Sequence, residues 1–105
     1  MATPEGQIQN AICDYLSLKG HFFWRNNSIG VYDPVGKRFR STPKYAMNGV
    51  PDIILIKDGF FVGLEVKTPK GRQSDNQKDF EKKCKEAGAE YYLVRSIDDV
   101  QEIGL

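Results

Sequence analysis

One stretch of the chain, residues 51–67, constrains the fold most: it reads PDIILIKDGFFVGLEVK, with an Asp-Gly dipeptide between two apolar runs. Asp-Gly in this setting predicts a β-hairpin with a two-residue turn. Counting outward from that turn pairs the two strands residue by residue and brings Asp52 opposite Glu65. A slip of one residue at the turn would abolish this pairing, so the expectation depends on the register.

Opposed carboxylates are the unusual feature of this hairpin. Directly opposed side chains in a β-ladder lie roughly 5 Å apart at Cβ, and like charges there are destabilising. A shared divalent cation would compensate, because Mg²⁺ prefers oxygen ligands and needs only one or two carboxylates. The sequence therefore predicts a site in which Asp52, Glu65 and the strand carbonyl of Val66 bind Mg²⁺ or Mn²⁺.

Lys67 and Gly63 are expected on the same face as Glu65, because strand residues two apart point the same way. Two carboxylates and a lysine on one face indicate a metal-dependent phosphodiesterase centre. Lys67 would orient or deprotonate the attacking water, or stabilise charge in the transition state. Gly63 is expected to mark the close approach of another backbone or a ligand, as glycine inside a strand often does.

Length and composition indicate one small globular domain spanning residues 1–105, with 40% hydrophobic and 28% charged residues. A core of this size is modest, so dimerisation would help stability. The chain shows no signal peptide and no long apolar run, and Cys13 and Cys84 lack CxxC spacing. We therefore expect a cytoplasmic protein with free thiols and no membrane partner. His21 is the only histidine, which argues against a zinc site.

Periodicity and capping signals predict an α/β sandwich around a mixed sheet. The first helix begins at a Thr-Pro cap and the second at a capping box. A Gly- and Pro-rich segment, residues 28–48, is expected to be a long loop or an irregular hairpin. The expected elements are a helix from Pro4 to Gly20, a strand at 21–25, the hairpin at 51–67, a helix from Ser74 to Gly88, a strand at 90–94 and a short helix at 97–103.

Glu5 and Gln77 are expected to reach the predicted site from the two longer helices. Glu5 falls on the apolar stripe of the first helix, three residues before Ile8, where it could bind a second metal ion; an acid in the first turn also favours the helix dipole. Gln77 occupies the third position of the capping box, which explains it structurally. It also aligns with Phe80 and Cys84, so it is expected to face the sheet.

Basic residues gather in two segments, one within residues 28–48 and one directly after Glu65. Such clusters beside an acidic site suit a phosphate backbone because they neutralise its charge. A solvated surface is an equally common explanation for charge clusters alone. The candidate DNA contacts in these segments are Lys37, Arg38, Arg40, Lys44, Lys70 and Arg72.

The Glu-x-Lys pattern of residues 65–67 is weak by itself. Glu81 and Lys83 repeat the same spacing on a predicted exposed helix. The first copy differs because it lies in a predicted strand, in register with Asp52 and in apolar surroundings.

Taken together, these motifs resemble the PD-(D/E)xK nuclease superfamily and, within it, the stand-alone VRR-NUC domain of phage and bacterial proteins. The similarity covers nearly the whole chain. It rests on Gly49-Val50-Pro51-Asp52, Glu65-Val66-Lys67, Gln77, Glu5-Gly6-Gln7-Ile8-Gln9, Arg25-Asn26-Asn27 and the segment of residues 67–74.

The resemblance implies a restriction-endonuclease-like αβββαβ core, a mixed β-sheet flanked by helices, and Mg²⁺- or Mn²⁺-dependent cleavage by Asp52, Glu65 and Lys67 with support from Glu5 and Gln77. It further implies a homodimeric, structure-selective DNA endonuclease acting on four-way (Holliday) junctions, since two-fold symmetry presents two sites to two strands. Two alternatives remain open: a restriction- or repair-type nuclease acting on flap or linear DNA, and a nucleic-acid-binding module without catalysis.

The chain departs from the family at the motif Val-Arg-Arg, for which the family is named. Here Val94-Arg95 is followed by Ser96. Arg95 could still contact a phosphate, whereas Ser96 is suited to cap the last short helix.

Overall fold

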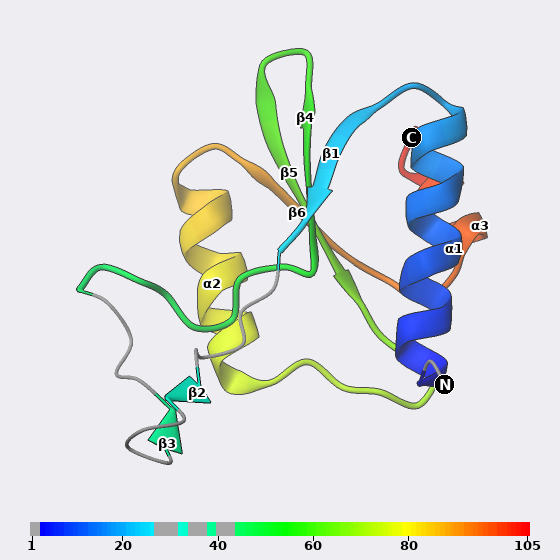
Figure 1. Ribbon diagram of the computed structural model, residues 1–105. Helices are drawn as coiled ribbons and strands as arrows, with labels where there is room; N and C mark the ends of the chain where they lie inside the picture. The colour runs from blue at the N-terminus through cyan, green and yellow to red at the C-terminus, as the bar shows by residue number, and fades with distance from the viewer. Residues whose placement is uncertain (1–2, 27–31, 34–37, 40–43) are drawn as a thin grey trace.

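A four-stranded mixed sheet forms the centre of the computed structural model, which describes residues 3–26, 32–33, 38–39 and 44–105 (Figure 1). The strand order is β1-β4-β5-β6, antiparallel throughout except for the parallel pair β5-β6. A separate short antiparallel pair, β2-β3, lies within the segment expected to be a loop or irregular hairpin. The strands are β1 (Phe22–Arg25), β2 (Tyr32–Asp33), β3 (Arg38–Phe39), β4 (Ile53–Lys57), β5 (Phe60–Val66) and β6 (Glu90–Val94).

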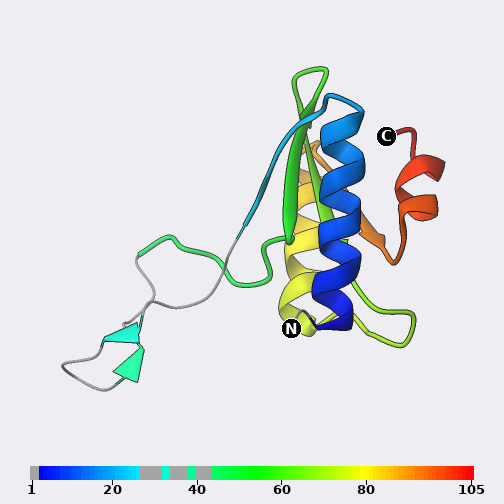
Figure 2. The ribbon, with the colours of Figure 1, turned by 45° about the vertical axis from the view of Figure 1, so that its right-hand side comes forward.

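Helices cover both faces of the sheet: α1 and α3 pack on one face and α2 on the other (Figures 1 and 2). The helices are α1 (Pro4–Leu18), α2 (Asp75–Glu86) and α3 (Ile97–Glu102). Thr3, Ser74 and Ser96 cap them, as their side chains accept from backbone N–H groups in the first turns. The expected αβββαβ order is therefore confirmed. Within the described part of the chain, no helix is long and apolar enough to cross a membrane.

The hairpin has the predicted register, with Lys57 opposite Phe60 and Ile53 opposite Leu64. The two turn residues, Asp58 and Gly59, have positive φ angles of 53° and 82°, as a two-residue turn of this type requires. Strand β4 begins at Ile53, so Asp52 lies just beyond the last backbone pair.

The two faces of the sheet differ in character. Toward α1 and α3, strand side chains such as Leu55 and Leu64 join Ile12 and Leu16 of α1 in a core from which water is excluded. Because side chains alternate along a strand, Glu65 and Gly63 face the α2 side. Helix α2 packs against β6, so the site is on the α2 side of the sheet.

Candidate active site

The loop that leads into Asp52 is packed directly onto the first turn of α2. Gly49 has φ of 79°, and a Cβ there would lie 2.3 Å from the carbonyl oxygen of Asn76 and 2.8 Å from the backbone nitrogen of Gln77. Only glycine allows this approach. The contact holds the Asp52 loop against the helix end that carries Gln77.

The close approach expected at Gly63 is made by a proline ring of the same chain. A Cβ on Gly63 would lie 2.6 Å from Cγ of Pro51, which is itself buried. Residue 63 therefore leaves room for the Pro51 ring, and the ring places the following residue, Asp52, over the end of β5. We expected another backbone or a ligand to approach Gly63, but the group that approaches it is the side chain of Pro51.

Asp52 is fixed by a hydrogen bond across the end of the hairpin. Its Oδ2 accepts from the backbone nitrogen of Val66 at 2.9 Å. The next residue, Lys67, donates its backbone N–H in the other direction, to the carbonyl of Val94 at 3.0 Å. In an extended strand the N–H and C=O of one residue point to the same side, so the Val66 carbonyl is directed to the Asp52 side of β5.

Glu65 is almost completely buried, with 1% of its surface exposed, and donors surround its carboxyl group. Gln77 Nε2 donates to Oε1 at 2.7 Å. The ammonium group of Lys67 lies 3.7 Å from the same oxygen, and Tyr91 donates its hydroxyl to Oε2 at 3.5 Å. The structure thus brings Glu65, Lys67 and Gln77 together as the sequence predicted.

Burial is the largest cause that raises the pKa of Glu65, to about 8, and the charge of Asp52 and a hydrogen bond between the two carboxyl groups contribute to that rise. Lys67 acts in the opposite direction, whereas Glu5 adds to the rise. The hairpin register and the hydrogen bond from Val66 to Asp52 place the two acids side by side as predicted. The raised pKa of Glu65 favours its protonated form at neutral pH, which lowers the electrostatic cost of the pair.

Gln77 serves the helix cap and the site at once. Its side-chain Oε1 accepts from the backbone nitrogen of Ser74 at 2.8 Å, and its backbone N–H donates to Ser74 Oγ at 3.2 Å. Because the cap occupies the amide oxygen, the amide nitrogen is left to face Glu65. The capping box predicted from sequence is confirmed, and it orients the side chain that holds Glu65.

Glu5 lies near the site without joining the pair of acids. It lines a shallow hollow together with Thr68, the residue after Lys67. Among the described residues, no three His, Cys, Asp or Glu side chains gather closely enough to hold a metal ion. The structure therefore brings Asp52 and Glu65 together, and a metal-binding role for Glu5 stays a prediction.

Arg95, a predicted DNA contact, holds the loop that follows Lys67. One guanidinium nitrogen, Nη1, donates to the carbonyls of Thr68 and Gly71, at 2.5 Å and 2.8 Å. The predicted helix cap at Ser96 is confirmed, since its Oγ accepts from the backbone nitrogen of Asp99 at 3.2 Å.

The other predicted DNA contacts differ in how far the structure describes them. Lys44, Lys70 and Arg72 are exposed, so they can meet solvent or a ligand. Lys37 and Arg40 lie outside the described residues, as does the side chain of Arg38. DNA contact by all seven basic residues, Arg95 included, stays a prediction.

Sequence reasoning missed Tyr91 and Gln73. Tyr91 has 2% of its surface exposed and lies opposite Gly63 in the parallel pairing of β5 with β6. Gln73 Nε2 donates to the Tyr91 hydroxyl oxygen at 3.3 Å and to Glu81 Oε1 at 3.1 Å. A parallel pairing across a helical crossover has no turn to set its register, so no local signal could have placed Tyr91 beside Glu65.

We expect Gly49→Ala to destabilise the protein more than Gly59→Ala. Both glycines have a left-handed backbone, with φ of 79° and 82°, which costs another residue about 1–2 kcal/mol. A Cβ on Gly59 would meet nothing within 4 Å, whereas one on Gly49 would collide with α2. Gly49→Ala should therefore lose roughly 1–3 kcal/mol more in urea unfolding. Equal losses would show that the loop does not need this close approach.

We expect the free energy of unfolding of the metal-free protein to fall as the pH rises from about 5 to about 8. Folded Glu65 keeps its proton up to a pKa of about 8, whereas the ordinary value is 4.5. The folded state therefore binds more protons than the unfolded state in this window, and stability falls by up to about 1.4 kcal/mol per pH unit. Unfolding by urea in EDTA at several pH values measures the slope.

Glu65→Gln should flatten this pH dependence, because glutamine cannot titrate. Glu81→Gln is the matched control, since hydrogen bonding to Lys85 lowers the pKa of Glu81. A wild-type curve no steeper than that of Glu65→Gln would contradict the raised pKa.

The fold is shared with solved structures of VRR_NUC proteins. No family model and no curated protein matches the chain. One similar structure, titled "VRR_NUC domain", has a TM-score of 0.68 at 20% identity over 97% of this chain and 95% of that one. Another, titled "VRR_NUC domain protein", has a TM-score of 0.60 at 13% identity over 98% of this chain and 86% of that one. The resemblance expected from the motifs is thereby confirmed at the level of the fold, over nearly the whole chain.

Proposed function

We propose that this chain is a metal-dependent, structure-selective DNA endonuclease that hydrolyses phosphodiester bonds and cleaves four-way junctions as a homodimer. The observation that carries the proposal is the buried Glu65 beside Asp52, with the Lys67 ammonium 3.7 Å from Glu65 Oε1. The fold shared with VRR_NUC structures supports it. The resemblance of Asp52, Glu65-Val66-Lys67 and Gln77 to that family's motifs supports it as well.

The donor atoms of the site fit Mg²⁺ or Mn²⁺. Asp52 and Glu65 supply carboxylate oxygens and Val66 a backbone carbonyl, and hard divalent cations prefer such oxygens. Two adjacent acids, one of them buried, are electrostatically costly while no cation neutralises them. A dication held by Asp52 and Glu65 would remove that cost and would bind Glu65 in its deprotonated form.

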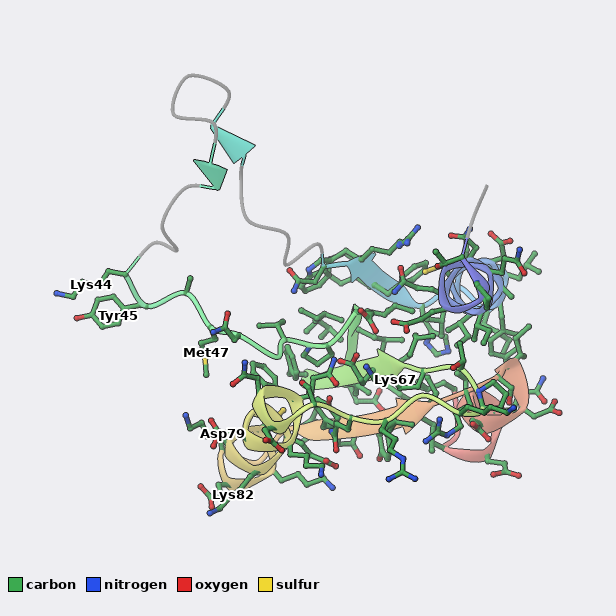
Figure 3. The ribbon with its side chains drawn as sticks, turned by 90° about the horizontal axis from the view of Figure 1, so that it is seen from below. Lys44, Tyr45, Met47, Lys67, Asp79 and Lys82 are labelled. Carbon is green, nitrogen blue, oxygen red and sulfur yellow. The ribbon has the colours of Figure 1, made fainter. Side chains whose placement is uncertain are left out.

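The chain's own residues would divide the work of hydrolysis. A bound divalent cation would supply Lewis acidity toward the phosphate and the attacking water. Lys67 has 13% of its side chain exposed against 1% for Glu65, so its ammonium could orient the water or neutralise charge developing on the phosphate. Gln77 keeps the Glu65 carboxylate in one orientation. Figure 3 shows Lys67 between α1 and α2, whereas Lys82 projects outward from α2.

Exposed cations near the site favour a nucleic-acid substrate. Lys70 and Arg72 belong to the loop that directly follows Lys67, and Arg95 fastens this loop by two hydrogen bonds. Cations held beside the reacting centre neutralise neighbouring phosphates of a DNA backbone. The loop would thus position the strand that is cut.

Two other functions remain as alternatives to junction cleavage. One is a restriction- or repair-type nuclease that acts on flap or linear DNA with the same residues. The other is a nucleic-acid-binding module without catalysis. The buried acid pair favours an enzyme, because a pure binding module gains nothing from the cost of burying Glu65 beside Asp52.

The proposal is tested with purified protein and labelled four-way junction, flap and linear duplex DNA, each in Mg²⁺, Mn²⁺ or EDTA. We expect paired, symmetric nicks near the junction centre with either metal, and none in EDTA. Light scattering of the same samples at micromolar concentration should give twice the chain mass. Cutting of flap or linear DNA in preference would favour the first alternative. A folded protein that cuts no substrate would exclude catalysis, and a monomer would exclude paired cutting by a preformed dimer.

We expect Lys67→Ala to reduce the cleavage rate on the order of 10²-fold or more while leaving DNA binding nearly intact. Lys83→Ala is the matched control, because Lys83 has the same Glu-x-Lys spacing but lies exposed on α2 in an ion pair with Asp79. Single-turnover cleavage and gel-shift binding separate the two effects. An unimpaired Lys67→Ala, or an equal loss in Lys83→Ala, would remove the role assigned to Lys67.

A further inference from the structure

The second carboxyl oxygen of Glu65 has a donor that the catalytic motifs do not include. Gln77 and Lys67 act on Oε1, whereas the hydroxyl of Tyr91 faces Oε2 at 3.5 Å. Tyr91 comes from β6, on the far side of β5 from Asp52. The carboxyl group is therefore held from two sides, by a helix and by a neighbouring strand.

Gln73 determines which way the Tyr91 hydroxyl points. Its amide nitrogen lies 3.3 Å from the Tyr91 oxygen and 3.1 Å from Glu81 Oε1. An amide nitrogen can only donate, so the Tyr91 oxygen accepts from it and its own proton is left for Glu65. The ammonium group of Lys85 lies 2.8 Å from Glu81 Oε2 and holds the outer end of this series of hydrogen bonds.

Tyr91 is built as a rigid, neutral donor. It has 2% of its surface exposed, and the centroid of its ring lies 6.3 Å from the centroid of the Phe80 ring in α2. Burial is the largest cause that raises the pKa of Tyr91 well above its usual value. A tyrosine hydroxyl is ordinarily protonated at neutral pH, so it can donate to the carboxyl group.

We propose that Tyr91 is a positioning residue for the candidate metal ligand Glu65, with Gln73 setting the direction of its hydroxyl. The inference rests on the proposed function, since it assumes that Glu65 binds a divalent cation. With Gln77 hydrogen-bonded to Oε1 and Tyr91 to Oε2, the plane of the carboxyl group is fixed relative to Asp52. Hydrogen-bond partners of metal ligands commonly contribute about 10–100-fold to metal affinity or activity.

The first test is Mn²⁺ binding by Tyr91→Phe in the absence of DNA, measured by calorimetry or by electron paramagnetic resonance. We expect the Kd to rise by about 10–100-fold, while thermal unfolding in EDTA shows a folded protein. Tyr92→Phe is the matched control: it removes the neighbouring hydroxyl, which donates to Glu90 on the other face of the sheet. This control should bind Mn²⁺ like the wild type.

Cleavage kinetics give a second, independent readout. In Tyr91→Phe the Mn²⁺ concentration for half-maximal cleavage should rise with the Kd, and the rate at saturating Mn²⁺ should recover most of the wild-type value. Gln73→Ala should shift the metal dependence in the same direction by a smaller factor. Because both changes act through one hydroxyl, the double variant should be no weaker in metal binding than Tyr91→Phe alone.

The outcomes separate this inference from the proposed function. If the wild type binds Mn²⁺ and cuts DNA but Tyr91→Phe binds Mn²⁺ as tightly, the positioning role is wrong and the nuclease stands. If Tyr91→Phe fails to fold, Gln73→Ala decides, and unchanged metal binding in that variant overturns the inference. A wild type that neither binds Mn²⁺ nor cuts DNA removes both proposals.

Discussion

Burying the carboxyl group of Glu65 inside an α/β sheet is costly unless donors or a cation compensate it. Here the donors come from three places: Gln77 at the start of α2, Tyr91 in β6 and Lys67 just after the end of β5. Each therefore depends on a different part of the fold being correctly placed. The position of this one side chain links the hairpin, the second helix and the parallel strand pair.

Close backbone packing brings those parts together. The Gly49 backbone lies so near the first turn of α2 that a Cβ would collide with Asn76, and Gly63 leaves room for the ring of Pro51. These two contacts place Asp52 over the end of β5, where its carboxylate accepts from Val66. The geometry of the candidate site is thus held by residues with no side-chain chemistry of their own.

The two faces of the sheet carry different kinds of side chain. The face toward α1 and α3 is a conventional apolar core that stabilises the domain. The face toward α2 carries Glu65, Lys67 and Tyr91, whose polar groups are hydrogen-bonded or ion-paired to one another or to Gln73 and Gln77. Because alternating strand residues point to opposite faces, the apolar core and the candidate site share β5 without competing for positions.

Much of this arrangement followed from local signals in the sequence. The Asp-Gly turn set the hairpin register by itself, and the capping box located the start of α2, because both depend on the preferences of a few adjacent residues. Together they predicted the opposed acids, Lys67 beside them and Gln77 facing inward. Only the tertiary structure decided the rest: the Tyr91–Glu65 contact, the use of Arg95 to hold a loop, and the separation of Glu5 from the acid pair. These depend on a parallel strand pairing and on loop packing, whose registers are set by contacts distant in sequence and leave no local pattern.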